Sequence, residues 1–256
     1  MTTLSHILRY RRGTAARESH RSSRSPCSSG GLALVYRGPA SLPGCPEAAA
    51  ELLRASSRPL RVEFVGPREP RQLSTASLAD AVLYVQPGGA ELDDAYRHLR
   101  PHRKDIRRFV AAGGRYLGFC LGGYLAGASP GFGLLPGDSD QYITTELATI
   151  HSEEDAVVEV NWRGQLRQLY FQDGPCFQLD PRADTTVLAT YPNQAVAASV
   201  SGFGRGRVGV VGPHPEAEAD WFTDAALRDP GRNHPSPANA RGRDLGLDLL
   251  NEVMRP

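Results

Sequence analysis

Cys120 has the sequence context of a catalytic nucleophile. It stands in the run Gly118-Phe119-Cys120-Leu121-Gly122, with apolar residues before it and a stretch rich in small residues after it. Glycines two positions before and two after a nucleophile are typical of a strained strand-to-helix elbow, where a Cβ atom would meet neighbouring backbone. The N-terminal end of a helix also favours the thiolate, which is the reactive form of cysteine. We therefore expect Cys120 to attack a substrate, although a small buried cysteine beside a tight turn is the simpler alternative.

His214 and Glu216 could supply the base that a thiol nucleophile requires. They follow an apolar run that ends at Val211. A nucleophile needs a base, and the base needs a carboxylate to orient it. Two residues separated by one in an extended turn can point to the same side. The sequence predicts that His214 faces Cys120 while Glu216 binds the other ring nitrogen; the alternative is an exposed histidine in a proline turn.

Gly88 and Gly89 lie directly after the run Val85-Gln86-Pro87. Glycine allows backbone N–H groups to approach a ligand oxygen closely, so these residues and the N–H of Leu121 could form an oxyanion hole. A plain Gly-Gly turn is the alternative. The position of Gly88 and Gly89 directly after an expected strand favours the oxyanion hole, because doubly wound sheets carry their sites at the carboxyl ends of strands.

Apolar runs of strand length alternate with helical segments in the first half of the chain. Strands are expected at 32–36, 61–65, 81–85, 115–119 and 206–211, with helices at 46–53, 92–99, 104–112, 120–126 and 245–253. Short, closely spaced runs after Ile143 predict antiparallel hairpins near 157–160, 166–171, 187–190 and 195–201. The expected fold class is α/β: a doubly wound, mostly parallel, flavodoxin-like sheet with helices on both faces and added antiparallel hairpins.

The length of 256 residues suits one domain with tails. Residues 1–30 are rich in Arg and Ser, which predicts a disordered tail and leaves a targeting segment as the alternative. Residues 31–256 are expected to form the α/β domain, including a C-terminal helix after a Pro/Gly/Asn-rich loop at 229–243.

Composition argues against several classes of partner and site. The formal net charge of +1 gives no field that would attract nucleic acid, and no run of 18 apolar residues predicts a membrane span. The four cysteines form no C-x-x-C pair, which argues against a structural zinc site. We expect free thiols, a cytoplasmic protein, and neither metal nor cofactor.

These motifs and three further runs carry a resemblance to known proteins. Pro87-Gly88-Gly89, the Cys120 elbow and His214-Pro215-Glu216, in that order, resemble the class I glutamine amidotransferases. The runs 35–39, 137–142 and 170–175 resemble, more narrowly, the family named for the N-terminal region of biotin-protein ligases. The resemblance covers roughly residues 31–222 and implies a small-molecule substrate, with a homodimer or a partner synthetase as further possibilities.

Candidate residues for substrate recognition lie in the loops at strand ends, where polar groups line the site of such folds. They are Arg37, Gly38, Gln141, Tyr142, Gln172 and Asp173. After the elbow glycine this chain has Gly123 and Tyr124, where glutamine-using relatives typically have His or Met and then Gln. This difference counts against glutamine as the substrate. The chain also lacks a recognisable biotin ligase domain, so it is not expected to ligate biotin by itself.

Three functions remain open from the sequence. The first is a cysteine hydrolase or amidase that cleaves a C–N bond with a Cys120-His214-Glu216 triad. The second is a non-catalytic binding or regulatory module that retains the fold, since fold alone does not fix function. The third is a redox or electrophile sensor that uses Cys120.

Overall fold

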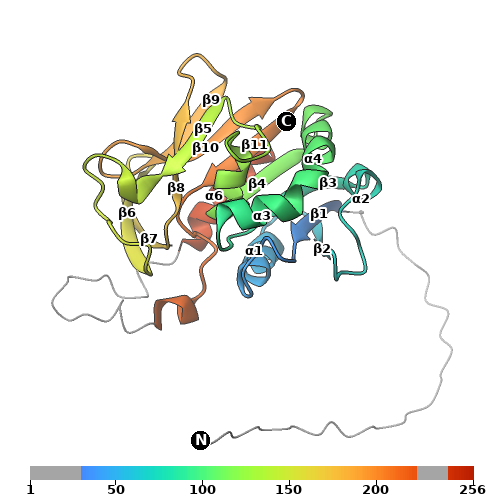
Figure 1. Ribbon diagram of the computed structural model, residues 1–256, viewed down its shortest axis with the longest axis horizontal. Helices are drawn as coiled ribbons and strands as arrows, with labels where there is room; N and C mark the ends of the chain where they lie inside the picture. The colour runs from blue at the N-terminus through green and yellow to red at the C-terminus, as the bar shows by residue number, and fades with distance from the viewer. Residues whose placement is uncertain (1–29, 224–241) are drawn as a thin grey trace, which may run out of the picture.

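Five parallel strands form one half of the sheet in the computed structural model, which describes residues 30–223 and 242–256 (Figure 1). Their spatial order is β2-β1-β3-β4-β11. The strands are β1 (Gly31–Tyr36), β2 (Leu60–Val65), β3 (Ala81–Gln86), β4 (Arg115–Phe119) and β11 (Gly206–Val211). This flavodoxin-like order places the carboxyl ends of β1, β3, β4 and β11 at one edge of the sheet, where such folds bind their ligands. The expected fold class is confirmed.

The other half of the sheet is antiparallel and continues from β11 in the order β10-β9-β6-β7, with β8 beside β10 and β5 beside β8. These strands are β5 (Gly137–Gln141), β6 (Ala156–Trp162), β7 (Gln165–Phe171), β8 (Pro175–Leu179), β9 (Thr185–Thr190) and β10 (Val196–Phe203). The predicted hairpins are thereby confirmed. The strands β5 and β8 were not predicted, because β5 is polar and β8 begins at a proline.

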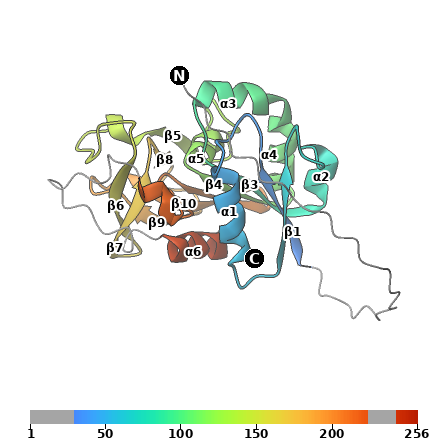
Figure 2. The same ribbon diagram turned by 90° about the horizontal axis from the view of Figure 1, so that it is seen from below.

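Helices cover both faces of the sheet (Figure 2). One face carries α1 (Cys45–Arg54) and α6 (Arg243–Val253), which also contact each other. The opposite face carries α2 (Thr75–Ala79), α3 (Leu92–Leu99), α4 (Arg103–Ala111) and α5 (Leu121–Ala126). Of these helices, only α2 was not predicted; it is a single short turn capped by Ser74, whose hydroxyl accepts from the Ser77 N–H.

Each face has its own apolar core. Alternating side chains of β1 divide between them: Ala33 and Val35 pack toward α1 and α6, whereas Leu32, Leu34 and Tyr36 pack toward α3, α4 and α5. The first core also includes Trp162, Leu188 and other residues of the antiparallel strands. The core on the face of α1 and α6 therefore extends across both halves of the sheet.

Hydrogen bonds and ion pairs, as well as apolar packing, hold the C-terminal helix α6 against the sheet. Asp248 accepts hydrogen bonds from the indole of Trp162 (2.9 Å) and from Arg163 (2.7 Å), and Glu252 accepts from Arg163 (2.8 Å). Leu249 is fully buried. The predicted helix at 245–253 is confirmed, whereas the predicted tail and most of the loop at 229–243 lie outside the described residues. Across the part of the chain that is described, no helix is both long and apolar enough to cross a membrane.

Candidate active site

Cys120 occupies the strained turn between β4 and α5. Its φ of 46° and ψ of −107° lie outside the regions that residues with a Cβ atom usually adopt. A Cβ atom on Gly118 would lie 2.3 Å from the carbonyl oxygen of Gly122, and one on Gly122 would lie 2.1 Å from that of Gln86. Both glycines are therefore required by close backbone approach. The backbone N–H of Cys120 donates to Val211 O (2.9 Å), which fixes the turn beside the end of β11.

His214 and Glu216 form a buried pair after β11. Nδ1 of His214 lies 2.8 Å from Oε1 of Glu216, and the two side chains are 5% and 0% exposed. Oε2 of Glu216 is also buried and has no hydrogen-bond partner among the described residues. The backbone N–H of His214 donates to Tyr170 O (2.9 Å), so the histidine is held at the edge of β7.

The imidazole of His214 lines the smaller of two cavities beside Cys120 together with the thiol, and the two groups interact electrostatically. Because Nδ1 faces Glu216, Nε2 is the ring nitrogen left for the thiol. Burial acts to lower the pKa of His214, but Glu216 and then Cys120 outweigh it and raise this pKa to about 10. A protonated imidazole beside the Glu216 carboxylate is thus favoured.

Aromatic rings hold the histidine from two sides. The His214 ring meets Tyr170 edge-on with centroids 5.7 Å apart and meets Trp221 in the same way at 5.3 Å. Gly88 borders a further part of the ring, since a Cβ atom there would lie 2.8 Å from Cε1 of His214. The absence of a side chain at Gly88 therefore makes room for the imidazole.

Gly89 and Leu121 lie together beside Cys120. Both line the larger cavity next to Cys120, and a Cβ atom on Gly89 would lie 2.3 Å from Cδ2 of Leu121. Leu121 is the first residue of α5, and the first N–H groups of a helix have no acceptor within it. Gly88 lines neither cavity next to Cys120. The geometry thus favours Gly89 and Leu121 over Gly88 as donors to an oxyanion.

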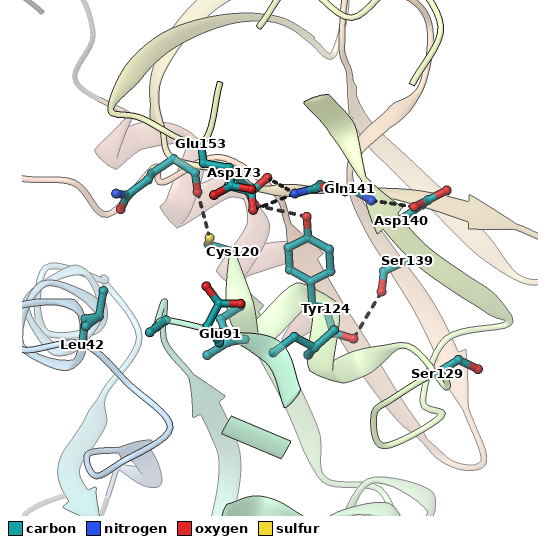
Figure 3. A pocket seen from close by; sticks show the side chains of 15 residues that line it. Leu42, Glu91, Cys120, Tyr124, Ser129, Ser139, Asp140, Gln141, Glu153 and Asp173 are labelled. Atoms are coloured by element: carbon teal, nitrogen blue, oxygen red, sulfur yellow. Dashed lines mark hydrogen bonds between the residues drawn. The ribbon is translucent and has the colours of Figure 1, made fainter. Parts of the chain in front are cut away.

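A cavity of about 530 Å³ opens beside Cys120 (Figure 3). The Cys120 thiol lies 3.5 Å from Gln172 O, and Nε2 of Gln141 donates to both carboxylate oxygens of Asp173 at 2.9 and 3.0 Å. Of the six residues predicted for substrate recognition, Gln141, Gln172 and Asp173 line this cavity. They come from β5 and from the turn between β7 and β8.

A smaller cavity of about 160 Å³ lies on the histidine side of Cys120. Its lining is mainly apolar and aromatic and includes Pro43, Cys45, Tyr170, His214 and Trp221. Leu42, Gly89, Cys120 and Gln172 line both cavities. Cys120 therefore lies where a polar cavity and a mainly apolar and aromatic cavity meet.

Arg37 and Gly38 are not where a substrate-binding role would put them. Arg37 donates to Glu69 (2.7 and 3.0 Å) and to Glu47 (3.0 Å), and its guanidinium stacks 3.7 Å from the centroid of the Phe64 ring. Gly38 forms a turn with Ser41. Neither residue lines a cavity next to Cys120. The expectation for these two is corrected: the intramolecular ion pairs of the arginine bind the end of β1 to its surroundings.

Tyr142 is also removed from the site. It is fully buried and stacks on Tyr191 with ring centroids 3.8 Å apart, and its hydroxyl lies 3.1 Å from Oγ1 of Thr149. It lines neither cavity. The expectation for Tyr142 is therefore corrected as well. Its neighbour Gln141 faces the cavity, whereas the ring of Tyr142 points into the apolar core.

Most of the polar residues that line the larger cavity were not predicted from the sequence. Tyr124, Ser139 and three carboxylates, those of Glu91, Asp140 and Glu153, line the larger cavity. The Tyr124 hydroxyl donates to the backbone oxygen of Asp173 (3.1 Å). Tyr124 stood out in the sequence only as a difference from glutamine-using relatives. The acidic residues are scattered over 62 positions and share no motif, so only the fold brings them together.

The described residues contain no group of three His, Cys, Asp or Glu side chains that could hold a metal ion. Cys45, Cys120 and Cys176 are all buried free thiols, and Cys27 lies outside the described residues. Burial is the main cause that raises the pKa of both Cys45 and Cys176 above the usual range. These two thiols are therefore poor nucleophiles.

Comparison with known families identifies one matching region. Residues 33–138 match the family described as "Biotin-protein ligase, N terminal". This region runs from β1 to the start of β5 and contains Gly88, Gly89 and the Cys120 elbow, but not His214 or Glu216. A comparison with curated proteins gave no match.

Solved structures similar to the chain include glutamine amidotransferases. One is described as a glutamine amidotransferase (17% identity, 87% of this chain and 100% of the other, TM-score 0.55). Another is a glutamine amidotransferase from Thermotoga maritima (16% identity, 88% and 96%, TM-score 0.55). A third is PurLQS from Thermotoga maritima (15% identity, 88% and 99%, TM-score 0.51). At these identities the likeness concerns the fold.

Proposed function

We propose that this chain, which has the class I glutamine amidotransferase-like fold with a region similar to the N-terminal family of biotin-protein ligases, is a cysteine-dependent amidase. The observation that carries the proposal is the placement of three side chains: Nδ1 of His214 lies 2.8 Å from Glu216, and His214 and Cys120 interact electrostatically and line the same cavity. The volume of the larger cavity beside Cys120 is within the range of small-molecule sites.

The first half of the reaction forms a thioester. The Cys120 thiolate attacks the carbonyl carbon of an amide, and the carbonyl oxygen becomes an oxyanion that accepts from the N–H groups of Gly89 and Leu121. His214 then gives its proton to the leaving nitrogen as the C–N bond breaks. Glu216 holds the ring so that Nε2 faces the reacting atoms.

The second half of the reaction releases the acid. Water enters where the amine has left, and neutral His214 accepts a proton from it as its oxygen attacks the thioester carbonyl. The oxyanion forms again at the same donors, and its collapse breaks the C–S bond. The carboxylic acid leaves, and Cys120 returns as a thiolate beside protonated His214.

The residues after the elbow support a substrate other than glutamine. Gly123 packs tightly, since a Cβ atom there would lie 3.0 Å from Phe177 and 3.1 Å from Pro175. Tyr124 is fixed by its bond to the Asp173 carbonyl. A larger side chain at position 123 would press against Phe177 and Pro175, and position 124 has a phenol in place of an amide.

The proposal is tested by ammonia release from glutamine and from a panel of primary amides. The wild-type protein is compared with Cys120→Ala and with Cys176→Ala, a matched control because Cys176 is a buried thiol outside both cavities. We expect turnover by the wild type and by Cys176→Ala, and a loss of about 10³-fold or more in Cys120→Ala. Equal rates in all three proteins would contradict the proposal. Silence from all three would favour a non-catalytic binding module.

A further inference from the structure

We propose that the larger cavity beside Cys120 selects substrates that carry a positively charged group, such as an amine or a guanidine, away from the scissile amide. The proposal rests on the proposed amidase function and adds a substrate class to it. The charged group would lie among Glu91, Asp140, Glu153 and Asp173, while the amide carbonyl lies at Cys120.

The charge of the cavity lining has one sign. Its 15 residues include four carboxylates and no Arg, Lys or His. The whole chain is nearly neutral, with 29 Lys and Arg against 28 Asp and Glu. The excess of negative charge is therefore a local property of the space that opens on the nucleophile. An anionic group in this space would have no opposite charge to offset its desolvation.

The cavity carboxylates also lack the arginine partners that are common elsewhere in the fold. Arg37 pairs with Glu69, Arg167 with Asp244 and Arg163 with Asp248, each with an N to O distance of 2.7 Å. Among the described residues, no salt bridge involves any of the four carboxylates in the cavity. Their charge remains available to a ligand.

Asp173 is the carboxylate with the most defined environment. Both of its oxygens accept from the neutral amide of Gln141. Partial burial raises the pKa of Asp173, the bond from Gln141 opposes this rise, and the charges of Glu153 and Glu91 add to it. A cation bound here would relieve the repulsion between these carboxylates.

Figure 3 shows how the parts are arranged. Asp173 and Gln141 lie on one side of Cys120, with the Tyr124 hydroxyl directed at the Asp173 backbone, and Glu91 comes from the loop before α3. The carboxylates thus belong to elements of both halves of the sheet. A substrate whose amide reached Cys120 would lie beside these carboxylates.

The test uses thiol reagents that differ only in charge, so that it does not require turnover. The second-order rate of Cys120 modification is measured with cationic 2-aminoethyl methanethiosulfonate and with anionic 2-sulfonatoethyl methanethiosulfonate, and the modified peptide is identified by mass spectrometry. The ratio of the two rates is divided by the same ratio for free 2-mercaptoethanol, which removes the intrinsic preference of a thiolate. We expect the corrected ratio to exceed about 10 at low salt and to fall as salt is added.

Matched variants locate the source of the preference. Glu153→Gln and Asp173→Asn should each reduce the corrected ratio at least about threefold, whereas Glu154→Gln should leave it unchanged, because Glu154 is an exposed neighbour outside the cavity. Circular dichroism confirms that each variant is folded. A corrected ratio near 1 in the wild type, or an equal drop in Glu154→Gln, would overturn the inference.

Amide turnover separates this inference from the proposed function. On the matched amides 6-aminohexanamide, hexanamide and adipamic acid, kcat/KM should fall in that order by about tenfold or more overall. If no amide is cleaved but the thiol reagents still show the cationic preference, the amidase proposal fails and the inference about the cavity stands. If hexanamide or adipamic acid is preferred, the amidase stands and the inference fails.

Discussion

At the scale of single residues, the site depends on how Glu216 sets the charge of His214. The imidazole is buried, and burial by itself disfavours its protonated form. The carboxylate at 2.8 Å and the Cys120 thiol reverse this effect and raise the pKa of His214 to about 10. In the proposed reaction, Glu216 is thus a positioning residue that also favours the protonated form of His214.

We predict that Glu216→Gln lowers both the reactivity of Cys120 and the stability of the fold in a pH-dependent way. The rate of Cys120 alkylation by iodoacetamide at pH 7 should fall by about tenfold or more, because the thiolate loses its charged partner. In urea unfolding at pH 6, the variant should be about 2 kcal/mol less stable, the typical loss for a hydrogen bond to a charged group.

The sign of the pH dependence follows from the direction of the shift. A histidine with a raised pKa in the folded state contributes stability fully below its unfolded pKa of about 6.5, and this contribution is lost as pH rises through about 10. The difference in unfolding free energy between wild type and Glu216→Gln should therefore shrink between pH 6 and pH 10.5. Glu218→Gln, an exposed carboxylate two residues further on, is the control and should show no such difference.

At the scale of elements, the junction of β4 and α5 shows what a short motif can predict. The two glycines around Cys120 indicated a strained elbow, and the backbone of Cys120 at φ 46° confirms it. The order of His214 and Glu216 after an apolar run predicted their pairing. The motifs succeeded because each depends on neighbours within a few residues, where the chain itself fixes the distance.

The loop residues were predicted less well for the opposite reason. Gln141, Gln172 and Asp173 line the cavity as expected, whereas Arg37 and Tyr142 do not. Whether a polar residue at a strand end faces the cavity depends on partners distant in sequence: Glu69 lies 32 residues after Arg37, and Tyr191 lies 49 residues after Tyr142. No pattern local to either position contains that information.

We predict that Gly122→Ala destabilises the elbow strongly. The added Cβ atom would lie 2.1 Å from the carbonyl oxygen of Gln86, so β3 and α5 must separate. The expected loss of unfolding free energy is about 1–3 kcal/mol, as for overpacking of a tight contact, with slower alkylation of Cys120. Gly202→Ala is the matched control, since its Cβ atom would meet only Asp184 at an ordinary 3.6 Å. Equal urea midpoints for the two variants would show that the close approach at Gly122 is not needed.

At the scale of the whole molecule, the site lies where two kinds of sheet meet. The segments that follow the parallel strands supply Cys120, Gly89 and Leu121, and the antiparallel half supplies Gln141, Gln172 and Asp173. The sequence predicted both regions but not their junction, because β5 is polar and β8 begins with a proline. The carboxylates that line the cavity come together only at this junction, so the negative charge of the cavity could not be predicted from either region alone.

We predict that the two halves unfold as one cooperative unit. The apolar core on the face of α1 and α6 includes both Val35 of β1, in the parallel half, and Trp162 of β6, in the antiparallel half. Helix α6 packs on the parallel half, and its Asp248 accepts a hydrogen bond from Trp162 in the antiparallel half. Far-ultraviolet circular dichroism, which reports on the whole backbone, should therefore give the same urea midpoint as the fluorescence of Trp162 in a Trp221→Phe variant. Two separate midpoints would show instead that the antiparallel half is an independent unit attached to a self-sufficient parallel domain, and the cavity between them would then change shape without global unfolding.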